Sequence, residues 1–462
     1  MDTVLDYIRS HHDQYLAELV ELLKIPSISS EKEHKGDMKT AAKALAARMK
    51  KAGLSGVKVI PTAGHPSVYG EWCKAGKDKP TVLVYGHYDV QPVDPLNLWK
   101  TPPFEPSVRP STKVKGAKDL YARGAADDKG QLFIHLLAVE AHLKATGTLP
   151  VNVKFIFEGE EEIGSPNLVP LMKKHKALLK CDSVVVSDTP MFDYGKPSIT
   201  YGLRGLSFME VHVTGPNSDL HSGTFGGIAA NPINVLCDIV AKLTDKRGKV
   251  AIPGFYDDVV KLTAAERKAY AALKVSDASF KRQLGVRELA GEQGYSAVER
   301  QSARPTLDVN GISGGYEGKG AKTVIASKAM AKISMRLVPN QDPKKIARLF
   351  TKRIKELAPR SVRVEVFDLH GGDPAMTALD NPATQAAMRA LKKAFGKKVL
   401  TTREGGSIPI VADFQKILGA PTVLMGFGVP DENLHAPNEK LHLPNFFTGI
   451  EASAHYFTEL AG

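Results

Sequence analysis

Two hydrophobic patterns alternate along the first 200 residues of the chain. Apolar residues recur at helical spacing near the N-terminus, on a face formed by Leu16, Leu19, Val20 and Leu23, and again over residues 131–143. Short apolar runs rich in β-branched residues separate these helical stretches, at residues 57–60, 67–72, 81–85, 151–157 and 183–186. Strands that alternate with helices predict an α/β fold with a mainly parallel central sheet.

The pattern changes near residue 202. Residues 205–213 alternate between apolar and polar, and further strands, helices and a glycine-rich stretch follow. A helix after Asn381, a strand at residues 422–425 and a closing helix after Phe446 then return to the earlier pattern. The sequence therefore predicts one domain built from residues 1–202 and 373–462, interrupted by an inserted α+β domain of residues 203–372.

Length and composition are typical of a folded protein. The chain has 462 residues, of which 43% are hydrophobic, and this length favours more than one domain. No apolar run approaches the length of a membrane span, so we expect no membrane association. The net charge of +12 is spread in short clusters such as Lys173–Lys174, and solvated helix faces explain it better than nucleic-acid binding.

Three cysteines, Cys73, Cys181 and Cys237, lie far apart in the sequence. An odd and scattered set argues against a disulfide framework and against a zinc site built from thiolates. It favours a reducing compartment, so we expect a cytoplasmic protein in which all three cysteines are small buried residues.

Ionisable side chains cluster at the ends of the predicted strands. They are His87, Asp89, Asp127, Asp128, Glu158, Glu160, Glu161, Glu162, Asp188 and His435. Each one alone could be a helix cap or part of a solvated turn. Ligands of open parallel sheets bind outside the carboxyl ends of the strands, however, and these groups would meet there. So much negative charge in one cleft is costly unless cations neutralise it, and imidazoles with carboxylates suit a divalent metal.

Seven segments carry a family resemblance when they are taken in order. They are GHYDVQP, WKTPPFEP, ARGAADDKG, EGEEEIGS, VSDTP, DLHSG and LHAPNEK. Together they resemble the M20 family of two-metal peptidases, and the segments TREGGSIP and AKTVIASKAMAKISMRLVPN look most like its cytosolic, carnosinase-like branch of non-specific dipeptidases. The resemblance runs from near residue 20 to the C-terminus. It implies a zinc-peptidase-like catalytic domain with an inserted lid or dimerisation domain.

The resemblance also implies a site that holds two divalent ions per subunit, Zn²⁺ or Mn²⁺, and acts on a small peptide. The ligands would be His87, Asp127 and Asp188 for one ion, and Asp127, Glu162 and His435 for the other. Asp127 would bridge the two ions, and its peptide bond to Asp128 would be cis. Asp89 would orient His87, and Glu161 would be the general base. Glu160, the extra glutamate of the acidic run, is expected to point to solvent.

By the same resemblance, the inserted domain would complete the site. His221 would reach across the interface of a homodimer to stabilise the oxyanion. Arg336 would pair with the C-terminal carboxylate of the substrate, a task that suits the bidentate guanidinium. Thr323, His370 and Ser407 match positions that contact the substrate in the family.

Other functions stay open at this point. The same ligands would serve an N-acyl amino acid hydrolase, a desuccinylase or a carboxypeptidase, because the pocket walls set the substrate. An inactive binding protein on the same scaffold is a further alternative, although Glu161 and all five ligands are present. The dipeptidase-like segments favour cleavage of short peptides with a free C-terminal carboxylate.

Overall fold

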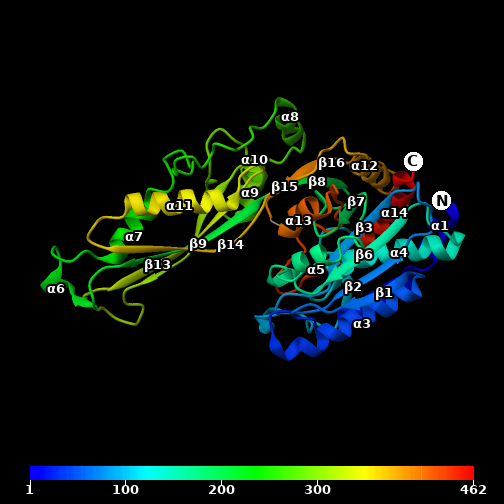
Figure 1. Cartoon of the computed structure of the whole chain (residues 1–462), viewed down its shortest axis with the longest axis horizontal. Helices are drawn as coiled ribbons and strands as arrows, with labels where there is room; N and C mark the ends of the chain where they lie inside the picture. The colour runs from blue at the N-terminus through cyan, green and yellow to red at the C-terminus, as the bar shows by residue number, and fades with distance from the viewer. Residues whose placement is uncertain (407) are drawn as a thin grey trace. The chain divides into compact units, whose positions relative to one another are not determined.

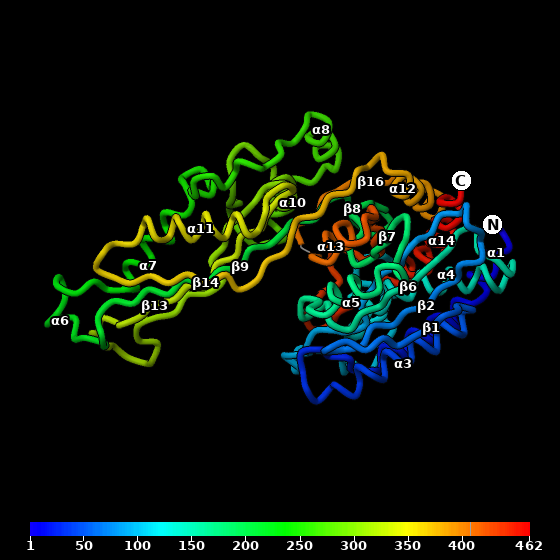
Figure 2. The backbone as a smooth tube through the Cα atoms, in the orientation of Figure 1, coloured from blue at the N-terminus to red at the C-terminus, as the bar shows by residue number. Residues whose placement is uncertain are grey.

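The computed structural model describes residues 1–406 and 408–462, which form two compact units (Figures 1 and 2). The first unit contains Met1–Tyr201, Thr377–Thr402 and Asp413–Gly462, and the second contains Gly202–Met376 and Arg403–Ala412. The segment 403–412, placed in the first domain from the sequence, thus belongs to the second unit. There the Arg204 side chain donates a 2.8 Å hydrogen bond to the Gly405 carbonyl.

A mixed sheet organises the first unit, in the order β1-β2-β6-β3-β7-β17-β8-β15, with β16 beside β8. The strands in its middle, β6, β3, β7 and β17, are parallel, and antiparallel strands flank them on both sides. The bounds are β1 Ser55–Ile60, β2 Ser67–Trp72, β3 Thr81–His87, β6 Asn152–Glu158, β7 Ser183–Val186, β8 Ser198–Leu203, β15 Ala375–Met376, β16 Leu400–Glu404 and β17 Thr422–Leu424. The predicted α/β fold with a mainly parallel centre is confirmed.

Helices cover both faces of the central strands, which explains why these strands are apolar throughout. On one face α4 contacts β3, and on the other the ring of Tyr85 in β3 packs edge-on against Phe414 of α13. The helices that build this unit are α1 Asp2–Ser10, α2 His12–Leu23, α3 Lys35–Lys51, α4 Lys129–Thr146, α5 Leu168–Lys174, α12 Pro382–Phe395, α13 Pro409–Leu418 and α14 Leu443–Leu460. Helix α4 is buried nearly all round, as an apolar central helix should be.

A small antiparallel sheet joins two parts of the first unit that are distant in sequence. Its order is β18-β5-β4, with bounds Lys440–His442, Lys118–Tyr121 and Ser107–Pro110. In the pairing of β18 with β5, Leu441 lies opposite Leu120. The segment just after β5 and the segment just before β18 are therefore held side by side. These three strands are too short for periodicity to have revealed them.

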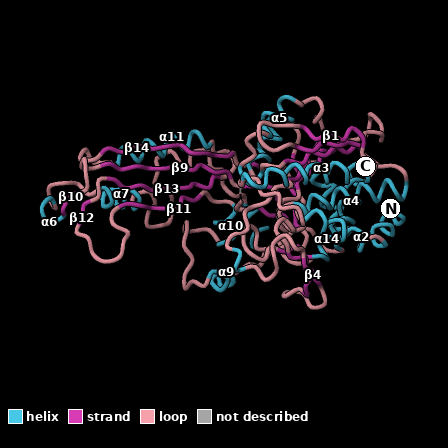
Figure 3. Tube along the Cα trace, turned by 90° about the horizontal axis from the view of Figure 1, so that it is seen from below, coloured by secondary structure: helices cyan, strands magenta, loops and turns pink. Residues whose placement is uncertain are grey.

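The second unit is an antiparallel sheet with helices on one face. The sheet order is β11-β13-β9-β14, with bounds Thr306–Gly314, Lys328–Leu337, Gly205–Thr214 and Arg363–Gly372. Strand β9 alternates between buried and half-buried positions, and its buried side packs with α7 Pro232–Ala241 and α11 Pro343–Leu357 in one apolar core. Figure 3 shows the short strands β10 Leu220–His221 and β12 Val324–Ile325, with α6 Ser222–Phe225, at one end of this sheet. The short helices α8 Ala264–Ala272, α9 Asp277–Leu284 and α10 Ala297–Ser302 were not anticipated.

The cysteines differ in part from expectation. All three are free, as predicted, but Cys73 and Cys237 are exposed and Cys181 is half-buried. Cys73 follows the end of β2, and Cys237 lies on α7 away from its buried residues. The expectation that all three are buried is therefore wrong. Among the described residues, we find no helix with the length and apolarity needed to cross a membrane.

His135 ties α4 to two other elements of the first unit. Its Nδ1 lies 2.8 Å from the Ser453 hydroxyl in α14, and its Nε2 lies 2.6 Å from the Ser187 hydroxyl, just after β7. Burial lowers the pKa of His135 to about 3, so the imidazole is neutral in the folded protein at ordinary pH.

We expect acid to destabilise the protein through His135. The unfolded chain takes up a proton near pH 6.5, whereas the folded chain resists protonation down to about pH 3. This residue should therefore lower the free energy of unfolding by about 1.4 kcal/mol per pH unit as pH falls through that window, and have no effect above it. Urea unfolding between pH 7 and about pH 5 measures the slope. His135→Gln, which keeps a donor and an acceptor, should show a shallower slope; equal slopes would contradict the assignment.

Candidate metal centre

The carboxyl ends of the parallel strands deliver ionisable groups to one edge of the sheet. His87 is the last residue of β3, and the turn Glu161–Ile163 follows β6. Asp188 follows β7, and Asp127 lies two residues before the start of α4. The structure brings these groups together, as expected for a ligand site at this edge.

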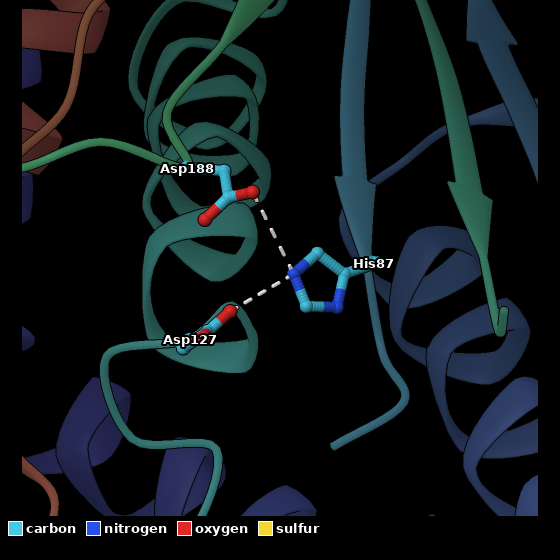
Figure 4. Close-up of side chains that lie close together, drawn as sticks. All are labelled: His87, Asp127 and Asp188. Atoms are coloured by element: carbon cyan, nitrogen blue, oxygen red, sulfur yellow. Dashed lines mark ion pairs between the residues drawn. The ribbon is translucent and has the colours of Figure 1, made fainter. Parts of the chain in front are cut away.

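The first group of potential ligands is His87, Asp127 and Asp188 (Figure 4). The buried His87 Nε2 lies 3.0 Å from Asp127 Oδ1 and 3.8 Å from Asp188 Oδ2. On the other side of the ring, Nδ1 lies 3.1 Å from the Asp89 main-chain oxygen, which favours the proton on Nδ1. The lone pair of Nε2 then faces two carboxylates, and among the described residues this nitrogen has no well-aligned hydrogen-bond donor or acceptor. A cation between these atoms would satisfy all three.

The second group is Asp127, Glu162 and His435. His435 Nε2 lies 3.0 Å from Asp127 Oδ2 and 3.2 Å from Glu162 Oε2. Asp127 thus presents one carboxylate oxygen to each histidine. Hydrogen bonds to Asp127 and Glu162 raise the pKa of His435 to about 10, so the carboxylates favour positive charge here as well.

The donor atoms fit divalent metal ions. Within each group the ligand atoms lie within 4.8 Å of one another, and they are imidazole nitrogens and carboxylate oxygens without sulfur. Burial, together with the negative charge of Asp127, raises the pKa of Asp188 well above its usual range. Nearby cations would reverse that shift. The Asp127–Asp128 peptide is cis, as the family resemblance implied.

Glu161 belongs to neither group, although it is adjacent to Glu162 in the chain. Burial and the neighbouring carboxylates raise the pKa of Glu161 to about 8, against the opposing effect of His87. Glu162 is held differently, because the Gln91 amide donates a 2.8 Å hydrogen bond to its carboxylate. Neighbouring side chains of one turn therefore separate into a ligand candidate and a carboxyl group that is available to exchange protons.

Asp89 does more than face His87. Its main chain, rather than its carboxylate, is the nearer partner of His87 Nδ1; the carboxylate lies 3.4 Å away. The carboxylate instead accepts the main-chain N–H groups of Glu161 and Glu162, at 3.2 and 3.1 Å, and the Ser29 hydroxyl at 2.7 Å. Asp89 therefore fixes the turn that carries the acidic pair.

Glu160 does not point to solvent. It is buried, and its carboxylate accepts hydrogen bonds from the His65 main-chain N–H at 3.0 Å and from the Asn167 amide at 2.9 Å. The expectation of a solvated side chain is wrong because the His65 main chain and the Asn167 side chain enclose Glu160 and supply donors to its carboxylate. Glu160 anchors the far side of the acidic turn.

Glu439 is a residue that the sequence analysis did not single out, although it lies in the LHAPNEK segment. It is buried and accepts hydrogen bonds from the loop that contains Asp127. No periodicity marked it, because the strand that follows, Lys440–His442, is short and mostly polar.

The remaining candidates lie in the second unit, at two different places. His221 ends β10 opposite Val324 of β12, and the Ser222 main-chain N–H donates a 3.0 Å hydrogen bond to the Thr323 carbonyl, so His221 and Thr323 belong to one loop cluster. Arg336 is on β13 opposite Leu206 of β9, and His370 is on β14 opposite Phe208. Ser407 lies outside the described residues.

Comparisons with known proteins give matches over most of the chain. Residues 83–459 match Peptidase family M20/M25/M40. The chain is 34% identical to a Cys-Gly metallodipeptidase of Candida albicans, over 99% of this chain and 96% of that protein.

Solved structures show the same similarity. The crystal structure of human carnosine dipeptidase 1 superposes with a TM-score of 0.83 at 32% identity, covering 100% of this chain and 98% of that one. An M20 family metallo-carboxypeptidase of Sulfolobus solfataricus gives a TM-score of 0.84 at 34% identity, covering 97% and 99%. The match of sequence and fold extends over nearly the whole chain, and the family match at residues 83–459 spans the segments that carry the five candidate ligands. This chain is therefore a member of the M20 family of metallopeptidases.

Proposed function

We propose that this protein is a two-metal dipeptidase that cleaves short peptides with a free C-terminal carboxylate. The observation that carries the proposal is the position of Asp127, whose two oxygens each face a different histidine. His87, Asp127 and Asp188 would hold one ion, and Asp127, Glu162 and His435 the other. Zn²⁺ and Mn²⁺ both suit this donor set. The dipeptidase activity of full-length relatives supports the substrate class.

The residues around the ions have distinct tasks in this mechanism. Bound divalent ions supply a lowered pKa for an attacking water and polarisation of the scissile carbonyl. Glu161 accepts the proton from the attacking water and later delivers it to the leaving amine. Its raised pKa matches a group that must both take up and release a proton near neutral pH. Asp89 keeps Glu161 in place through the main-chain N–H groups of the turn.

Arg336 would bind the C-terminal carboxylate of the substrate. Burial lowers the pKa of Arg336, with Asp308 opposing the shift, but a guanidinium stays charged at all physiological pH values. His370 lies near the same end of the sheet, on the other side of β9, and is exposed. Arg336 and His370 would together recognise the C-terminal carboxylate, the group that a free peptide has and a C-terminal amide lacks.

His221 and Thr323 would act in the site of a second subunit. Arg336 pairs with Leu206 near the start of β9, whereas His221 follows the far end of that strand, beyond Thr214. The length of β9 from Leu206 to Thr214 is about 27 Å at roughly 3.4 Å per residue. A dipeptide cannot span that distance, so Arg336 and His221 of one chain would serve different substrates. This argument supports a homodimer in which the second unit of each chain supplies His221 to the active site of the other chain.

We also propose a cytoplasmic location, with which the three free cysteines are consistent.

Carboxypeptidase activity is the second candidate, and the Sulfolobus solfataricus metallo-carboxypeptidase is the observation that favours it. Both activities require a free C-terminal carboxylate. They differ in how much peptide the site accepts on the amino side of the cleaved bond.

A hydrolysis panel tests the function. Protein stripped of metal and reconstituted with Zn²⁺ or Mn²⁺ is given unblocked dipeptides, matched C-terminal amides, longer peptides and N-acyl amino acids. We expect metal-dependent cleavage of the dipeptides and loss of cleavage on amidation, because Arg336 loses its carboxylate partner. Preferred cleavage of longer peptides at the C-terminus would favour the carboxypeptidase, and cleavage of acylated amino acids alone would favour an acylase. No cleavage by metal-loaded protein would overturn the proposal.

Glu161→Gln should abolish most turnover without loss of metal. The amide keeps the shape of the side chain but cannot accept the proton of the water, so kcat should fall by about 10²–10⁴-fold. Metal content after dialysis should stay at the wild-type value, because Glu161 lies outside both ligand groups. Glu160→Gln is the matched control on the same turn, and its kcat should fall far less. A wild-type rate for Glu161→Gln would remove it as the base.

Complementation tests whether His221 acts between subunits. His221→Ala should lower kcat by about 10²–10³-fold, as for loss of an oxyanion donor. Mixing and refolding this variant with Glu161→Gln should restore activity, because a mixed dimer has one site with both Glu161 and a partner His221. Random assembly of equal amounts predicts about a quarter of the wild-type rate. Activity that stays at the level of the separate variants would show that His221 does not act in the partner site.

A further inference from the structure

Glu439 is the buried carboxylate that joins two of the ligand-bearing loops. It lies directly before β18, four residues after His435, and is completely buried. Its Oε1 accepts the main-chain N–H groups of Ala126 and Asp127, at 2.9 and 3.1 Å. Its Oε2 accepts the main-chain N–H of Gly124 at 3.0 Å.

Arg123 completes this arrangement. Its guanidinium donates a 2.7 Å hydrogen bond to Glu439 Oε2 and a 3.0 Å hydrogen bond to the Pro92 carbonyl. Pro92 lies in the segment that continues from His87 and Asp89. The Arg123–Glu439 pair therefore contacts the chain near His87, the loop of Asp127 and the segment of His435.

The chemistry of these contacts requires an ionised carboxylate. Each of the four groups donates a hydrogen bond, and only an ionised carboxylate offers acceptors alone. Loss of the carboxylate would leave these buried donors without acceptors, which costs free energy. The loop that contains Asp127 could reduce this cost only by moving.

We propose that Glu439, together with Arg123, is a positioning residue that sets the distance between Asp127 and His435 and thereby the affinity of the site for its metal ions. The inference rests on the proposed two-metal function. Glu439 fixes Asp127 through the main-chain N–H of that residue, and it fixes His435 through the four-residue connection and the pairing of β18 with β5. Because Asp127 faces both histidines, a shift of its loop alters both ligand groups.

Glu439→Gln tests the inference. The amide has the same shape, but its NH₂ group faces donors instead of accepting from them. Calorimetric titration of metal-stripped protein with Zn²⁺ should show binding that is weaker by about 10–100-fold, as for loss of an outer hydrogen-bond partner of a metal ligand. The absorption spectrum of the Co²⁺-loaded variant should also change, because the arrangement of the ligands changes.

Glu432→Gln is the matched control. Glu432 is a buried glutamate of the same segment, and its Oε1 has no hydrogen-bond partner among the described residues. Its substitution should leave Zn²⁺ affinity and the Co²⁺ spectrum close to wild type. A purely structural role of Glu439 would lower the unfolding temperature without weakening metal binding in the folded protein, and that result would overturn the inference.

The outcomes separate this inference from the proposed function. If wild-type protein binds no metal, the proposed function fails. If wild-type protein binds two ions and Glu439→Gln binds both with the same affinity, only the positioning role is wrong. Should Glu439→Gln not fold, Arg123→Lys provides the same test, since it keeps the charge but cannot reach both Glu439 and Pro92. It should bind Zn²⁺ severalfold more weakly, and unchanged affinity would again overturn the inference.

Discussion

The structure depends on holding several carboxylates close together at the carboxyl edge of a parallel sheet. Asp127, Asp188 and the adjacent pair Glu161 and Glu162 come from three different segments, and each carboxylate would repel the others in a site of low dielectric constant. Parallel strands bring them to one edge, and Asp127, just before α4, is itself buried. Divalent cations relieve the repulsion. The electrostatic repulsion that makes this cluster unfavourable on its own is therefore also the source of its affinity for metal ions.

Main-chain N–H groups bound by buried carboxylates keep the cluster in place. Asp89 binds the N–H groups of the acidic turn, and Glu439 binds those of the Asp127 loop. In both cases the acceptor is a side chain and the donor is the backbone beside a candidate ligand. Such contacts fix the position of a ligand without occupying its metal-binding atoms. The ligand side chains can therefore point into the site while their loops are anchored from behind.

The sequence was sufficient for the parts of this structure that rest on periodicity and on strand ends. The apolar run 81–85 and the helical run 131–143 predicted β3 and α4, and the placement of His87 and Asp188 after strands predicted that they would meet. It was not sufficient for Glu160 and Glu439, because their burial depends on donors supplied by distant segments. The β18–β5 pairing was missed for a different reason, since strands of three or four residues carry no recognisable period.

The separation of Arg336 from His221 along β9 has a consequence for the protein in dilute solution. If each active site takes its oxyanion donor from a second chain, a lone chain would be a complete metal-binding protein but an incomplete catalyst. Metal loading would then be independent of protein concentration, whereas specific activity would follow the fraction of chains that are paired. Catalysis would begin only where the protein is concentrated enough to form dimers. Newly made, isolated chains would bind metal but would not cleave peptides.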